Sequence, residues 1–106
     1  MITLEDFMKL ELCIAEILSV APHPNADRLY LLEIRVGETV KQIVAGIRAF
    51  YTEEQLKGKK VVVVNNLQPA TIRGVESHGM ILAASAGDQL SLLVPERDLP
   101  SGTRVK

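Results

Sequence analysis

This 106-residue chain has no tryptophan, one cysteine and only four aromatic residues. A single cysteine excludes an intrachain disulfide and fits a reducing compartment. Four aromatic residues are few for base stacking, which argues against a single-strand binder of the stacking type. No apolar run approaches the roughly 20 residues of a membrane helix. The acidic N-terminus, with Glu5 and Asp6, does not match a signal peptide, so we expect a cytoplasmic protein without a membrane partner.

The chain also has few groups that could perform catalysis. Its two histidines, His23 and His78, fall in separate predicted loops, and no Cys/His spacing is typical of a zinc site. No glycine-rich phosphate loop precedes a helix. Cys13 falls on the polar phase of a predicted strand, and no base is visible that would lower its pKa. We therefore predict a chain that is not an enzyme and needs neither metal nor cofactor.

Apolar residues make up 47% of the chain, which indicates one globular domain over residues 1–106. The net charge of −1 does not by itself suggest a nucleic-acid binder. The basic residues are concentrated, however, because eight basic and only four acidic residues lie from Arg28 to Arg73. A basic middle between acidic ends can form a local positive face, although ordinary solvated charge also explains the count.

Local patterns predict two short helices and five main strands. Capping boxes that begin at Thr3 and Thr52 predict helices over residues 3–8 and 51–58. Apolar patterns predict strands over residues 10–20, 29–36, 40–45, 59–66 and 80–84, with a short pairing at 90–94. Glu16 interrupts the apolar phase of the first strand, which predicts a bulge near residues 15–16. We expect a polar loop before residue 80 and an irregular tail after residue 94.

The order of these elements indicates a fold. Five short strands, with one helix between the third and the fourth, are typical of the oligonucleotide/oligosaccharide-binding (OB) barrel. A long, bent first strand is what a small closed barrel requires. We therefore predict an all-β, five-stranded OB-fold barrel with an irregular C-terminal extension. In such a barrel, the loops that end at Arg28 and carry Arg73 rim the ligand groove.

Six sequence segments, in order along the chain, resemble one family. They are DFMKL (6–10), HPNADRL (23–29), QIVAGI (42–47), GKKVVVV (58–64), NLQPA (66–70) and RGVESHGMILAA (73–84). The chain is similar to the tRNA-binding domain shared by the C-terminal end of methionyl-tRNA synthetases, small free-standing bacterial tRNA-binding proteins and the mammalian endothelial-monocyte-activating polypeptide. The resemblance implies an OB barrel that binds tRNA largely by its folded shape, commonly as a homodimer and without a cofactor.

The chain departs from this family at several positions. The family usually has Arg, Gly and Lys where this chain has Cys13, Ala15 and Glu16, a serine at Ala45, and lysines at Gln68 and Thr71. Each change removes a phosphate contact or another polar RNA contact. Because fewer counterions are released when fewer phosphates are neutralised, these losses imply weaker binding with a flatter salt dependence.

Candidate contact residues follow from these loops. We predict that RNA is bound by Asn25, Arg28, Arg48, Arg73, Ser77 and His78. Arginine suits phosphates and base edges, although each of these arginines is also explained as a solvated charge. Asn25, Ser77 and His78 have the alternative of bonding to their own loop backbone. For a dimer interface we predict Met80, Leu92 and Val94, with Met80 packing in the core or at the dimer rather than on a base.

Two functional hypotheses remain open at this point. The first is a non-catalytic accessory protein that holds tRNA and assists methionyl-tRNA synthetase. The alternative is a protein-interaction or chaperone-like OB module with weak or no RNA binding, since one branch of the same fold resembles a secretion-associated chaperone. The near-zero net charge and the reduced basic set favour the alternative. Salt-dependent tRNA binding distinguishes the two.

Overall fold

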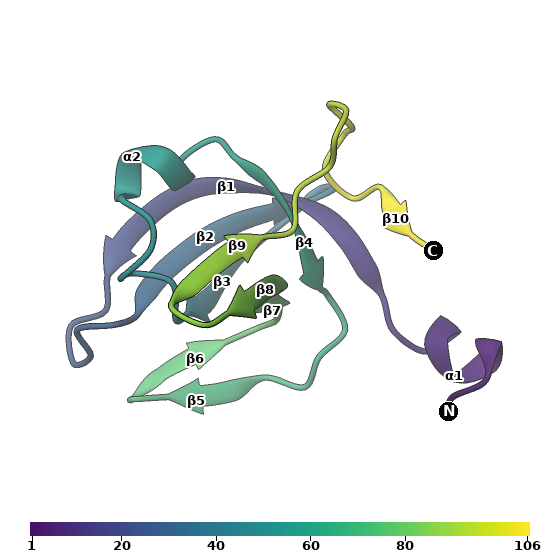
Figure 1. Ribbon diagram of the computed structural model, residues 1–106, viewed down its shortest axis with the longest axis horizontal. Helices are drawn as coiled ribbons and strands as arrows, with labels where there is room; N and C mark the ends of the chain where they lie inside the picture. Colours follow the sequence, from purple (N-terminus) through teal and green to yellow (C-terminus); the bar gives the residue numbers. More distant parts are fainter.

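The computed structural model describes residues 1–106 and shows a curled sheet of short strands with two short helices (Figure 1). The elements are α1 (Leu4–Met8), β1 (Leu12–Pro22), β2 (Tyr30–Val36), β3 (Thr39–Ala45), α2 (Glu53–Leu56), β4 (Lys60–Val64), β5 (Ala70–Ile72), β6 (Val75–Ser77), β7 (Met80–Ile81), β8 (Ala83–Ala86), β9 (Gln89–Leu92) and β10 (Arg104–Val105). The main sheet has the order β3-β2-β1-β4-β7, and β10 adds to β1. This five-strand path, with α2 between β3 and β4, confirms the predicted OB-type fold.

The long strand β1 joins the two halves of the curled sheet. Its first half pairs antiparallel with β4 and its second half with β2, so Glu16 lies opposite both Lys60 and Arg35. The irregularity lies between Ile17 and Ser19, and the bulge predicted at residues 15–16 was therefore placed too early. The ladder to β4 must continue through Glu16 before the strand turns toward β2, which is why the bend comes later.

The prediction that Cys13 lies on the polar side of β1 was wrong. Cys13, Ala15 and Ile17 are at most 3% exposed and belong to the main core cluster. Ile14, on the opposite face, is also buried, because the C-terminal segment crosses it: the Gly102 N–H donates to the Ile14 carbonyl at 2.7 Å. A strand covered on both faces does not show the alternation that marks a half-exposed strand.

The rest of the core agrees with the sequence patterns. Leu32, Ile34 and Val36 of β2 face the interior, and Val61–Val64 of β4 are buried on both faces, as predicted. Both capping boxes are present, between Thr3 and Asp6 in α1 and between Thr52 and Gln55 in α2. α1 buries none of its residues, whereas α2 buries Leu56 in the core. Neither helix is long or apolar enough to cross a lipid bilayer.

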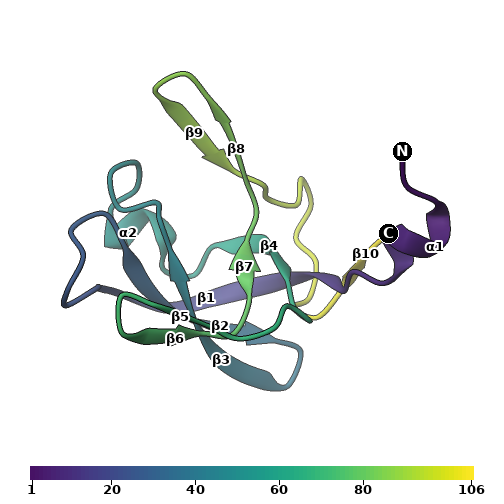
Figure 2. The same ribbon diagram turned by 90° about the horizontal axis from the view of Figure 1, so that it is seen from below.

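Three features of the C-terminal half differ from the prediction. The polar segment before residue 80 contains a hairpin, β5–β6, that a pattern of only three residues per strand does not reveal. The strand predicted over residues 80–84 divides into β7, which pairs with β4, and β8, which pairs with β9. Figure 2 shows the β8–β9 hairpin extending away from the curled sheet. Most of the tail is irregular, as expected, but it ends in β10.

The barrel is closed between β3 and the β6–β7 segment by single hydrogen bonds. The His78 N–H donates to the Gln42 carbonyl at 2.9 Å, and the Val44 N–H donates to the Ser77 hydroxyl at 2.9 Å. Gly79 stands at this seam with a φ of +151°, where a Cβ atom would lie 3.0 Å from the Val64 carbonyl oxygen. Glycine is therefore required for β3 and β4 to approach through this turn.

Candidate nucleic-acid interface

The β1–β2 loop and the β5–β6 turn meet at one end of the molecule. Both lie on the left side of Figures 1 and 2, opposite the two chain termini. The Arg73 Nη2 atom donates to the Asn25 carbonyl at 2.8 Å. Residues 25–29 and Arg73 together line a surface depression of about 410 Å³. Arg28 and Arg73, which are 45 positions apart in the chain, thus share one site.

His23 holds these two loops together. Its side chain is 3% exposed, its Nδ1 atom accepts from the Asn25 N–H at 3.0 Å, and its Nε2 atom lies 3.0 Å from the Ile72 carbonyl oxygen. The neutral tautomer with hydrogen on Nε2 satisfies both contacts. Our sequence interpretation treated His23 only as part of a loop. Its partner Ile72 lies 49 positions away, so no local pattern could reveal this positioning role.

Arg48 lies beside the depression. Its backbone N–H donates to the Arg28 carbonyl at 3.4 Å, and its side-chain Nη1 atom lies 3.5 Å from the Ala26 carbonyl oxygen. The guanidinium carbon stands 6.0 Å from the centroid of the Tyr30 ring, at the outer limit of a cation–π contact. Arg48 therefore contacts the loop that carries Arg28 and whose Asn25 carbonyl accepts from Arg73.

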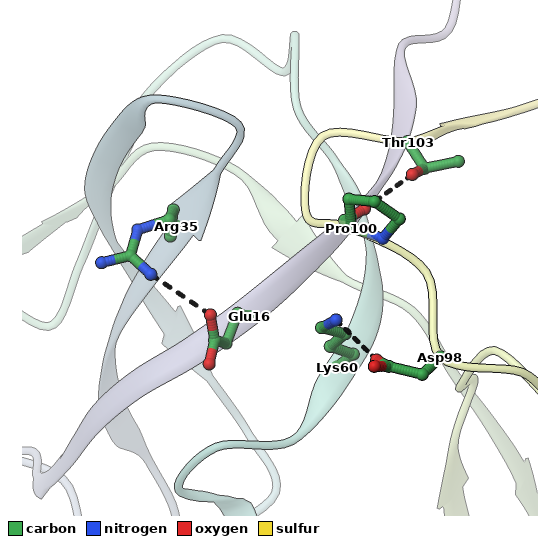
Figure 3. A network of polar contacts seen from close by, with 6 residues as sticks. All are labelled: Glu16, Arg35, Lys60, Asp98, Pro100 and Thr103. Atoms are coloured by element: carbon green, nitrogen blue, oxygen red, sulfur yellow. Dashed lines mark hydrogen bonds and ion pairs between the residues drawn. The ribbon is translucent and has the colours of Figure 1, made fainter.

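The charge of these arginines is not neutralised by ion pairs. Lys9, Arg35, Lys60 and His78 each lie within 4.0 Å of a carboxylate, and Figure 3 shows two of these pairs, Arg35 with Glu16 and Lys60 with Asp98. Arg28, Arg48 and Arg73 form no such pair. Asp27 also lines the depression, so one carboxylate stands beside the two guanidinium groups of Arg28 and Arg73. The surplus is positive and free to attract phosphate.

The other two predicted RNA contacts lie elsewhere. Ser77 is 3% exposed, and its hydroxyl accepts from Val44 and donates to the Gly79 carbonyl at 3.1 Å. Burial and two internal hydrogen bonds make Ser77 part of the barrel seam, so the prediction that it contacts RNA is withdrawn. His78 lines a separate depression with Gln42, and its Nε2 atom lies 2.8 Å from the Glu76 carboxylate.

We expect Ser77→Ala to lower the stability of the fold and leave tRNA affinity of the folded protein nearly unchanged. The substitution leaves the buried Val44 N–H without its acceptor, which costs about 1–3 kcal/mol. Urea unfolding measures the loss, and filter binding below the transition measures the affinity. A tRNA affinity that drops without a change in stability contradicts the structural role of Ser77.

The Cys13 thiol lies beside a partly buried polar cluster at the start of β1, which consists of Glu11, Lys41 and Asn65. The Asn65 side-chain amide donates to Glu11 at 2.9 Å, and Lys41 donates to the Asn65 carbonyl at 2.9 Å. Burial raises the pKa of the Cys13 thiol and the Glu11 carboxylate adds to this, while Arg104 and Lys41 oppose it. Burial also lowers the pKa of the Lys41 ammonium, against the effect of Glu11. The described residues contain no group of three metal-ligating side chains.

We expect the Cys13 thiol to resist alkylation in the folded protein. A thiol that is 3% exposed, with a raised pKa, presents little thiolate at neutral pH. Mass spectrometry after iodoacetamide treatment checks this, with denatured protein as the positive control. Rapid modification under native conditions contradicts the burial of this side chain.

The predicted dimer residues divide into two groups. Met80 is 46% exposed and Val94 is 51% exposed, so both are available to a partner. Leu92 is only 5% exposed and belongs to the core cluster, so its prediction as an interface residue was wrong. The alternation of β9 points Leu92 into the core, and its backbone N–H donates to the Tyr51 hydroxyl.

Comparison with curated proteins gives relatives of one kind. The chain is 43% identical over 102 residues to a methionine–tRNA ligase of Thermococcus onnurineus, a match that covers 96% of this chain and 14% of the relative. It is 47% identical over 105 residues to methionine–tRNA ligase 1 of Bacillus cereus, covering 99% of this chain and 16% of the relative. The chain therefore spans about one seventh of the length of these relatives.

Solved structures of similar length share the fold. A MetRS-related protein from Pyrococcus horikoshii superposes with a TM-score of 0.93 at 29% identity, covering 100% of this chain and 98% of that one. The CsaA chaperone protein from Picrophilus torridus superposes with a TM-score of 0.91 at 31% identity, with both chains fully covered. The family model described as "Putative tRNA binding domain" matches residues 12–104. The chain belongs to this tRNA-binding domain family.

Proposed function

We propose that this chain is a non-catalytic module that binds folded tRNA. The observation that carries the proposal is the group of three arginines, Arg28, Arg48 and Arg73, gathered where two loops meet and free of ion pairs. Guanidinium groups bind phosphate oxygens in a bidentate manner, and a cluster of them neutralises several phosphates of a compact RNA. Membership of the family and the methionine–tRNA ligase relatives support tRNA as the RNA concerned.

The mechanism is attraction followed by positioning. Phosphates are drawn to the positive end of the molecule, and the His23 hydrogen bonds hold the two arginine-bearing loops at a constant separation. Preorganised loops lose little conformational freedom on binding, so less of the interaction energy is spent on ordering them. No bond in the RNA is made or broken in this mechanism. The role is to hold tRNA, in the cytoplasm, for a methionyl-tRNA synthetase.

We further propose that the chain works as a homodimer. Met80 and Val94 are exposed, and so are Leu4 and Met8 of α1, a helix that buries none of its residues. Contiguous exposed apolar side chains mark interaction surfaces, and we assign these residues to such a surface. Two copies would present two arginine clusters to one tRNA, which raises avidity without any new contact.

A titration of total tRNA at two salt concentrations tests the main proposal. Binding through two or three phosphates predicts that affinity falls as the salt concentration rises. The logarithm of the binding constant, plotted against the logarithm of the salt concentration, should have a slope of about −0.7 per phosphate on single strands and about −0.9 on duplex. A protein that retains no tRNA at low salt contradicts the proposal. The alternative is a module that binds polypeptides, and the exposed apolar residues and the likeness to CsaA support it. A pull-down from nuclease-treated lysate that returns only unfolded polypeptides would favour this alternative.

A further inference from the structure

A second hollow lies next to the arginine cluster, on the other side of Arg48. It has a volume of about 670 Å³ and is lined by Tyr30, Arg48 and the run of residues 49–55 that leads into α2. This volume falls within the range of roughly 300–1,000 Å³ that small-molecule sites occupy. In both Figures 1 and 2, α2 and the β1–β2 loop lie at the same end of the molecule.

The hollow is joined to the arginine cluster through the backbone of residues 26–28. Arg48 lines the hollow, and it also hydrogen-bonds to the carbonyls of Ala26 and Arg28, which line the neighbouring depression. A nucleic acid whose phosphates contact Arg28 and Arg73 therefore passes the mouth of the hollow. The two sites are consecutive along one surface.

The chemistry of the hollow differs from that of the arginine cluster. It contains one cation, Arg48, and two carboxylates, Glu53 and Glu54, so its charge is unfavourable for a phosphate. It also presents flat surfaces, because Phe50 is 43% exposed and the Arg48 guanidinium lies over the Tyr30 ring. Aromatic rings and guanidinium planes are the groups on which unstacked bases lie.

The walls of the hollow are held in place from behind. The Tyr30 hydroxyl donates to the Tyr51 carbonyl at 2.8 Å, and the Tyr51 hydroxyl accepts from the Leu92 N–H at 3.0 Å. Thr52 and Gln55 are occupied by the capping box of α2. Phe50, by contrast, is neither in the core cluster nor packed against it, and no internal contact requires an aromatic ring at this exposed position.

We propose that an unpaired nucleobase of the bound RNA stacks in this hollow, against Phe50 and the plane of Arg48. The inference rests on the proposed tRNA binding and adds a base-binding subsite to it. Folded RNA offers such bases in its loops and at its ends. The phosphate cluster draws the backbone in, and the neighbouring hollow receives a base that is uncharged.

The chain contains no tryptophan, so Phe50→Trp places a single indole in the hollow, and this indole is excited at wavelengths that tyrosine does not absorb. We expect total tRNA to quench its emission, because a base stacked on indole quenches it, at tRNA concentrations that a filter assay of the same variant shows to be saturating. Leu10→Trp is the matched control: Leu10 is 41% exposed, close to the value for Phe50, and lies between α1 and β1. Its emission is expected to stay constant. Unchanged emission of Phe50→Trp, with tRNA bound, overturns the inference and leaves the proposed function intact.

A second measurement separates stacking from charge. Phe50→Ala removes an exposed ring without a charge, so we expect tRNA affinity to fall roughly 5- to 100-fold, with the salt slope unchanged. Phe50→Leu keeps apolar volume but not the ring, and is expected to behave like alanine. If Phe50→Ala binds tRNA with the affinity of the wild type, no base stacks on Phe50 and the proposed subsite is contradicted. Wild-type protein that fails to bind tRNA in the same filter assay contradicts the proposed function itself.

Discussion

Replacing Arg28 and Arg73 together by alanine is expected to weaken tRNA binding by roughly 100-fold or more at low salt. Hydrogen bonds to charged groups contribute about 1.5–3 kcal/mol each, and each tenfold in affinity corresponds to about 1.4 kcal/mol. Both side chains are exposed, so their loss leaves the core intact. Because each phosphate contact releases counterions, the salt slope is expected to decrease by about one for each arginine. Filter binding over a salt series measures both effects.

Arg35→Ala is the matched control for this pair. Arg35 is also an exposed arginine of the basic middle, but it lies 3.3 Å from the Glu16 carboxylate and near the opposite end of β2 (Figure 3). Its removal is expected to leave both affinity and salt slope close to those of the wild type. If the double variant and the control bind equally well, phosphate recognition lies elsewhere on the molecule.

Placing charges at the proposed dimer surface is expected to produce monomers with much weaker tRNA binding. Met80→Glu combined with Val94→Glu introduces two carboxylates at positions that are 46% and 51% exposed. Burial of unpaired charges in an interface opposes association. Linking two sites raises avidity by roughly 10²- to 10⁴-fold, and monomers lose this gain. Sedimentation velocity measures the oligomeric state, and filter binding measures the affinity.

Val40→Glu serves as the comparison for these charges. Val40 has a similar exposure, 49%, and lies at the start of β3, where it lines the depression of Gln42 and His78 and not the proposed dimer surface. It is expected to change neither the oligomeric state nor the affinity beyond a small effect of one added charge. A wild-type chain that sediments as a monomer contradicts the proposed homodimer without affecting the proposed arginine site.

Several features of the fold follow from neighbouring residues and could be predicted. The capping boxes at Thr3 and Thr52 depend on contacts three residues apart, and both helices begin where these contacts predict. The β2–β3 hairpin follows from alternation on either side of Gly37, which adopts a φ of +63° in the turn. Arg28 and Arg73 were predicted as candidates from the basic middle of the sequence and from the loops that rim an OB groove.

Other features depend on segments that are distant in sequence. Cys13 faces the core and Ile14 is also buried, because the tail near Gly102 covers the outer face of β1. Leu92 and Ser77 were assigned to surfaces, but Leu92 packs in the core and the hydrogen bond from Val44 holds Ser77 inside. A residue pattern describes which side chains alternate, and it does not state which face another segment will cover.

The amino-acid sequence by itself determined the helices, the main strands, the OB order and the two arginines, because these depend on local periodicity, capping and loop position. The loops of Arg28 and Arg73 were predicted to rim one groove, but only the tertiary structure decided that Arg48 lies beside them and that Arg73 binds the Asn25 backbone. That arrangement depends on the His23 hydrogen bonds to Asn25 and Ile72, which join segments 49 positions apart. Contacts of this kind form only after the chain has folded, and for that reason no local pattern contains them.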